Sequence, residues 1–91
     1  MLYSYISNKH ANLLVKITDG GAEYMCLDNN ATLSVEGDAE GAELHLNGVF
    51  VGTTETNAED DTYTVQFEDG TTKIVSCGED EFEDFALSLL A

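Results

Sequence analysis

The chain has no arginine, no proline and only three lysines among its 91 residues. Eighteen aspartates and glutamates outweigh these bases and give a formal net charge of −15. Such a chain cannot release the counterions of a phosphate backbone, which argues against direct binding of DNA, RNA or an anionic membrane. Its electric field instead attracts basic surfaces and speeds encounter with them. The charge therefore predicts a protein partner with a basic surface.

Long apolar stretches are also missing. No run approaches the roughly 18 apolar residues that a membrane-spanning helix needs. The first ten residues, MLYSYISNKH, lack the basic start and the apolar centre of a signal peptide. We therefore expect a soluble protein of the cytoplasm. Its 91 residues suffice for one small domain, covering residues 1–91.

Cysteine and histidine are equally scarce. Cys26 and Cys77 are too few for a disulfide scaffold and form no Cys-x-x-Cys pair, so we expect two reduced thiols that pack as small hydrophobes. The histidines are His10, in a polar loop, and His45, which faces Phe50 across a predicted hairpin. No nucleophile, phosphate-binding or metalloprotease motif occurs. The sequence therefore predicts a protein that is not an enzyme and that needs no cofactor.

A calcium site is disfavoured by the spacing of the acidic residues. The runs 28–30 and 59–61 both lack the alternating oxygen ligands of a calcium-binding loop. Three consecutive acids on an extended chain cannot all point at one ion. We expect no metal ligands.

The clearest structural signal is the stretch Ala42–Thr54, where Asn47-Gly48 separates two runs of alternating apolar and polar residues. An Asn-Gly pair favours a two-residue hairpin turn, because both central positions need positive φ. This register would place Leu46 opposite Val49, Leu44 opposite Val51 and His45 opposite Phe50. Those four aliphatic residues would then form the core face of the hairpin.

Strand patterns recur along most of the remaining chain. They cover residues 2–7, 13–18, 22–28, 31–36, 62–68 and 71–77. With Asp19-Gly20 as a turn, Lys16 should lie opposite Glu23. With a turn at Asp69-Gly70, Ile74 should face the core beside Tyr63, Val65 and Phe67, whereas Thr64, Gln66 and Lys73 should point outward.

The chain then changes from a strand period to a helical one. Residues 79–90 are predicted to form a C-terminal helix with an apolar stripe of Phe82, Phe85, Ala86 and Leu89. We expect this helix to cover the sheet or one edge of a sandwich. The predicted fold is mainly β, a β-sandwich or a twisted antiparallel sheet of about seven strands in successive hairpins, with one helix. Because proline is absent, charge must protect the edge strands.

Residues 39–77 resemble the hairpin of PEGA domains. The likeness consists of a Glu-Gly-Ala start, an alternating strand, an Asn-Gly turn, a return strand with an aromatic residue, and a Gly-Thr-Thr end. The matching residues are Glu40, Gly41, Ala42, Asn47, Gly48, Gly52, Thr53 and Thr54. Ala39 and Glu55 stand where that pattern has prolines. The resemblance implies a small β module with a binding role.

The acidic residues gather in three segments, at 36–43, 55–61 and 79–84. Rigidly spaced carboxylates on strands can present a row of negative charge, like that of a nucleic acid. The predicted partner-binding residues are Asp38, Glu40, Glu55, Glu59, Asp60, Asp61, Glu79, Asp80, Glu81, Glu83 and Asp84.

Small size, strong acidity and the lack of a catalytic motif resemble the phage-encoded inhibitors of host defence, namely anti-CRISPR and anti-restriction proteins. That resemblance implies a non-enzymatic inhibitor in the host cytoplasm, which blocks the nucleic-acid-binding surface of a CRISPR effector complex or a nuclease. Two alternatives remain: a PEGA-like adaptor module, and an acidic protein of a salt-adapted cytoplasm with another protein-binding role.

Overall fold

The computed structural model describes residues 2–37 and 41–91. In these residues eight strands precede one helix, which agrees with the predicted number of about seven. The elements are β1 (Tyr3–Ile6), β2 (Leu13–Thr18), β3 (Gly21–Cys26), β4 (Thr32–Gly37), β5 (Gly41–Leu46), β6 (Val49–Asn57), β7 (Thr62–Phe67), β8 (Thr72–Ser76) and α1 (Glu79–Leu90).

All eight strands belong to one antiparallel sheet in the order β1-β2-β3-β4-β5-β6-β7-β8. The fold is therefore the twisted sheet and not the sandwich. Every neighbour in the sheet is also a neighbour in sequence, as short turns favour. The β2–β3 hairpin has the predicted register, and Lys16 Nζ lies 3.6 Å from Glu23 Oε1 across the strands.

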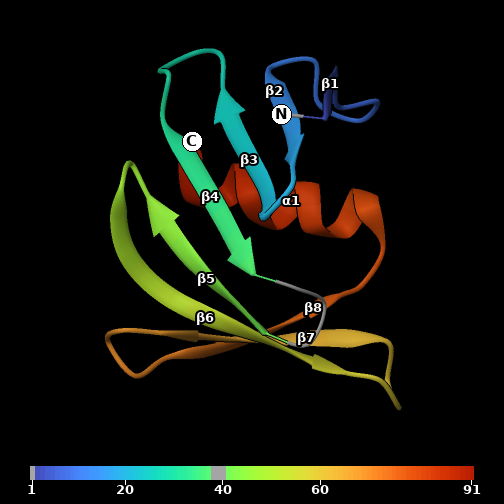
Figure 1. Cartoon of the computed structure of the whole chain (residues 1–91), viewed down its shortest axis with the longest axis vertical. Helices are drawn as coiled ribbons and strands as arrows, with labels where there is room; N and C mark the ends of the chain where they lie inside the picture. Colours follow the sequence, from blue (N-terminus) through green and yellow to red (C-terminus); the bar gives the residue numbers. More distant parts are fainter. Residues whose placement is uncertain (1, 38–40) are drawn as a thin grey trace.

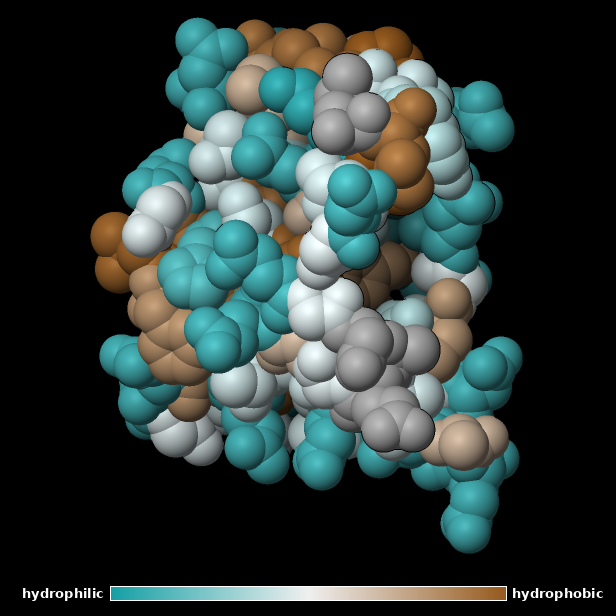
Figure 2. Space-filling view, viewed as in Figure 1, coloured by the Kyte–Doolittle hydropathy of each residue, from teal (hydrophilic) through white to brown (hydrophobic). Residues whose placement is uncertain are grey.

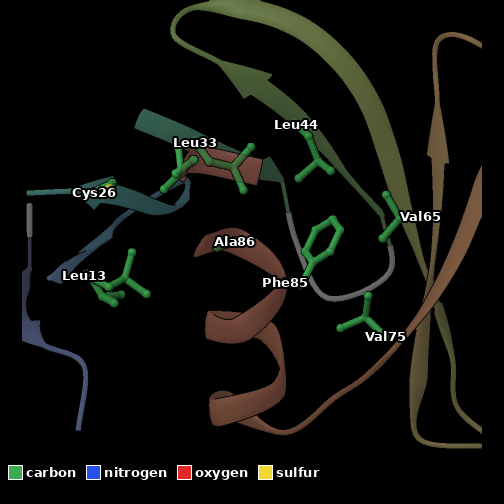
Figure 3. Packing of buried hydrophobic residues seen from close by; sticks show 10 residues of the cluster. Leu13, Cys26, Leu33, Leu44, Val65, Val75, Phe85 and Ala86 are labelled. Carbon is green, nitrogen blue, oxygen red and sulfur yellow. The ribbon is translucent and has the colours of Figure 1, made fainter. Parts of the chain in front are cut away.

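The sheet curves around α1, which lies against one of its faces (Figure 1). Phe85 and Ala86 project from the helix into the space between β2 to β4 on one side and β7 and β8 on the other (Figure 3). Apolar residues from β2 to β5, β7 and β8 converge on them. The buried cluster is Leu13, Val15, Cys26, Leu33, Leu44, Val65, Val75, Phe85, Ala86 and Leu90.

The central hairpin is confirmed in its turn but not throughout its register. Asn47 and Gly48 have φ angles of 51° and 85°, as a turn of this type requires. Leu46 pairs with Val49 and His45 pairs with Phe50, as predicted.

The predicted pairing of Leu44 with Val51 is wrong, because Val51 is the extra residue of a β-bulge and Leu44 pairs with Gly52. Of the expected core face, Leu44 is fully buried, whereas Val49 at the hairpin tip is 65% exposed.

β7 faces as predicted, with Val65 buried and Tyr63 and Phe67 against the rings of α1, whereas β8 has the opposite facing from the predicted one. The Phe67 amide donates to the Thr71 carbonyl at 2.9 Å, so three residues and not two separate this pair. One added residue in the turn shifts β8 by one position, so every side chain of β8 points to the other face of the sheet. Ile74 is therefore 61% exposed, and Lys73 lies on the helix side, 5.4 Å from the centre of the Phe85 ring.

We predict that Gly52→Ala destabilises the protein by about 1–3 kcal/mol, the usual range for an overpacked site. A Cβ atom at this position would collide with the carbonyl oxygen of Gln66 on β7, and a backbone atom cannot move aside cheaply. Gly20→Ala is the matched control, because no atom lies within 4 Å of its added Cβ. Urea unfolding of both variants measures the difference. Equal stabilities would contradict the tight contact between β6 and β7.

Candidate partner-binding surface

The predicted partner-binding acids have three different environments. Glu83 is buried, and Asp84 is paired with basic side chains. Asp38 and Glu40 lie outside the described residues. The remaining acids are exposed at one corner of the fold or beside it: Glu55, Glu59, Asp60, Asp61, Glu79, Asp80 and Glu81.

Glu83 faces the interior and holds β1 to the helix. Its side chain is 1% exposed. Its two carboxylate oxygens accept hydrogen bonds from the Tyr5 hydroxyl at 2.9 Å and the Ser7 hydroxyl at 2.6 Å. These bonds satisfy a group that would otherwise be costly to bury. The prediction that Glu83 contacts a partner is wrong for this reason, and the residue is structural.

Asp84 is half-exposed but already neutralised by the loop after β1. Its carboxylate lies 2.6 Å from Lys9 Nζ and 2.5 Å from His10 Nε2. The hydrogen bonds from Lys9 and His10 lower the pKa of Asp84 below its ordinary value of 3.8. Asp84 therefore contributes little to the field that a partner meets.

The second and third acidic segments meet at one corner of the molecule. The Cys77 amide donates to the Asp61 carbonyl at 3.0 Å, which brings the β6–β7 turn beside the start of α1. Six exposed carboxylates gather there, and we call them the corner acids: Glu59, Asp60, Asp61, Glu79, Asp80 and Glu81. The negative charges on the first turn of α1 are also favoured by the helix dipole.

An acidic groove lies on the face of the sheet that points away from α1. It has a volume of about 580 Å³, and its lining includes Glu36, Glu43 and Glu55, which we call the groove acids. Glu36 on β4 pairs directly with Glu43 on β5, and Glu55 on β6 stands diagonal to Glu43. Hydrophilic side chains cover the middle strands in the view of Figure 2. The groove leads toward the corner acids along β6. Glu55 lies near the end of this strand at Asn57, and the turn that carries Glu59, Asp60 and Asp61 follows directly.

His45 is the basic group nearest to the groove acids. Its Nδ1 atom lies 3.4 Å from Glu36 Oε2, and its Nε2 atom lies 3.8 Å from Glu43 Oε1. The ring also contacts Phe50 edge-on, with 5.6 Å between the centres. Within residues 2–37 and 41–91, no lysine pairs with a groove acid. Lys9 pairs with Asp84, and Lys16 pairs with Glu23.

An aromatic pocket lies on the other face of the sheet, beside α1, and Gly37, Ala42 and Thr54 line both this pocket and the groove. The rings of Tyr24, Tyr63 and Phe82 contribute to its lining.

Sequence reasoning missed this pocket and the pairing of Glu36 with Glu43. The register could have revealed the acid pair, because short strands joined by an acidic loop place the two glutamates opposite each other.

Comparisons of the chain with protein-family models, with curated proteins and with solved structures find no match. The likeness to PEGA domains and the likeness to phage inhibitors therefore stay resemblances. Across the described part of the chain, no group of three or more His, Cys, Asp or Glu side chains could hold a metal ion. Nor is any described helix long and apolar enough to cross a membrane. Both cysteines are free thiols, as expected, and Cys26 is buried.

We predict that Glu83→Ala lowers the free energy of unfolding by about 3 kcal/mol, because the hydroxyls of Tyr5 and Ser7 lose their acceptor in the interior. Asp80→Ala removes the same charge from an exposed position on the same helix and should cost less than about 1 kcal/mol. Urea unfolding at neutral pH gives both values. Equal losses in the two variants would show that Glu83 acts only through its charge.

The pairing of Asp84 predicts a loss of stability in acid. Its pKa is lower in the folded state than in the unfolded chain, so its contribution is complete above about pH 4 and disappears as the pH falls through the folded pKa. Asp84→Asn should therefore flatten the decline in unfolding free energy between pH 5 and about pH 3 relative to the wild type. Urea unfolding at steps of half a pH unit tests this. Parallel curves for the two proteins would contradict it.

Proposed function

We propose that this protein is a non-enzymatic inhibitor that binds the basic nucleic-acid-binding surface of a defence protein, such as a CRISPR effector complex or a nuclease. The observation that carries the proposal is the pairing of Glu36 with Glu43 at the groove, with Glu55 diagonal to them. Like charges placed directly opposite each other destabilise a sheet. Sequences that break such a local rule usually do so at functional sites.

The arrangement of the carboxylates supports mimicry of a nucleic acid. Neighbouring strands stand about 4.8 Å apart and alternate residues of one strand about 6.7 Å apart, so the groove acids form a rigid two-dimensional array. The corner acids extend this array toward the helix. A basic cleft shaped for phosphates would meet carboxylates at fixed spacings, and DNA or RNA could not occupy it at the same time.

The lysines of the chain support the same proposal by their positions. Lys9 and Lys16 pair with Asp84 and Glu23, and Lys73 covers the Phe85 ring, so none of them pairs with the groove acids in the described structure. Positive charges from a partner would relieve the repulsion between Glu36 and Glu43. Complex formation would therefore stabilise the folded state of this protein.

The test mixes the protein with a panel of CRISPR effector complexes and restriction nucleases and measures the affinity of each. We expect a complex that prevents nucleic-acid binding and that weakens at least tenfold between about 50 and 200 mM salt, because the groove charges are screened. The triple variant Glu36→Gln, Glu43→Gln, Glu55→Gln should weaken that complex at least tenfold.

A second triple variant controls for net charge. Asp19→Asn, Asp28→Asn and Glu68→Gln remove three charges from turns elsewhere in the chain and should leave the affinity within a factor of about three. Equal weakening by both triple variants would reject the groove as the contact. The absence of any complex across the panel, or an affinity that does not change with salt, would reject the proposed function.

A further inference from the structure

The aromatic pocket beside α1 combines two features that recognise organic cations. It has a volume of about 290 Å³, and the rings of Tyr24, Tyr63 and Phe82 line it. Glu79, whose side chain is exposed, contributes a carboxylate to the same lining. Figure 2 shows a recess with a hydrophobic floor on the viewed face, between the lower end of β4 and the start of α1.

The three rings form one cluster that comes from three elements. The Phe82 ring on α1 lies 5.6 Å from the Tyr24 ring on β3 and 5.6 Å from the Tyr63 ring on β7. The planes meet at 40° in the first pair and 84° in the second. Because these rings are not coplanar, they present surfaces in several directions. A cation above an aromatic face is attracted by the negative quadrupole of the ring.

The charges around the pocket favour a cation as well. The pKa of Tyr24 is raised well above its ordinary value of 10, first by burial and then by neighbours that include the charges of Glu83 and Glu79. The pKa of Tyr63 is raised by burial, by Cys77 and by the charge of Asp61. The part of these shifts that comes from Glu83, Glu79 and Asp61 reflects a negative potential, which also attracts a positive group to the same space.

We propose that this aromatic pocket takes up one arginine side chain of the basic partner, with the guanidinium stacked on a ring and bound to the Glu79 carboxylate. Arginine suits the pocket better than lysine, because a planar guanidinium both stacks on aromatic rings and binds a carboxylate through two hydrogen bonds. The inference rests on the proposed function for its partner. Gly37, Ala42 and Thr54 line both spaces, the groove on the outer face of the sheet and the pocket on the face that packs against α1.

The first test needs no partner protein. N-acetyl-arginine methylamide is titrated into the protein while the ring resonances of Tyr24, Tyr63 and Phe82 are followed by NMR. We expect saturable shifts with a Kd of about 1–10 mM, as befits a single side chain. The citrulline analogue, which has the same shape without the charge, should cause no saturable shift, and the lysine analogue should bind at least threefold more weakly.

Variants locate the binding to the pocket. Glu79→Gln and Tyr63→Leu should each weaken arginine binding at least fivefold. Glu68→Gln removes the same charge from an exposed turn outside the pocket, and Tyr3→Leu removes an exposed tyrosine on β1, so both should bind arginine like the wild type. Unchanged circular dichroism verifies that each variant is folded. Binding that survives Glu79→Gln, or citrulline binding equal to that of arginine, would overturn the proposal.

The second test separates this inference from the proposed function. In the complex found with the panel, Glu79→Gln and Tyr63→Leu should weaken affinity at least fivefold relative to Glu68→Gln. A wild-type complex that all three variants form equally well would reject the pocket and retain the inhibitor. Arginine binding in the NMR titration without any complex across the panel would retain the pocket and reject the inhibitor.

Discussion

The packing of α1 against the curved sheet is the constraint on which the rest of the fold depends. No hydrogen bonds join β1 to β8, so the sheet is open and cannot close its own core. Phe85 and Ala86 supply the missing side of that core (Figure 3). Glu83 and Asp84 directly precede Phe85 in the helix. Glu83 accepts a hydrogen bond from Ser7 after β1, and Asp84 pairs with Lys9 in the loop that follows. One turn of helix thus carries both the apolar and the polar attachments.

Features set by neighbouring residues could be predicted from the sequence. The Asn47-Gly48 turn, the opposition of Lys16 and Glu23, the meander order and the bounds of α1 each follow from turn chemistry or from a period that a short window contains. The exposure of the acids on the candidate surface could also be predicted, because charged side chains without a partner remain in water. Their concentration in three segments is a property of the sequence itself and does not depend on packing.

Features that depend on a single added residue or on distant contacts could not be predicted. A bulge at Val51 and a three-residue turn before Thr71 each change which face a side chain takes. The bulge has no local sequence signal, and Asp69-Gly70 suits a two-residue turn as well as the end of a three-residue one. Glu83 looks like any other acid of its helix until the hydroxyls of β1 are placed against it. The aromatic pocket likewise exists only because three elements bring their rings together. These parts of the site are therefore determined by tertiary packing and cannot be predicted from composition.

The attachment of α1 to β1 also has a consequence for the order in which the chain folds. Each pair of neighbouring strands closes a short loop, whereas the bond between Ser7 and Glu83 spans 76 residues. The entropy lost on closing a loop rises with its length, so long-range contacts become favourable only after shorter ones have shortened the effective loop. We therefore expect the hairpins to pair first and the docking of α1 to complete the structure. The helix then converts eight locally paired strands into one cooperative unit.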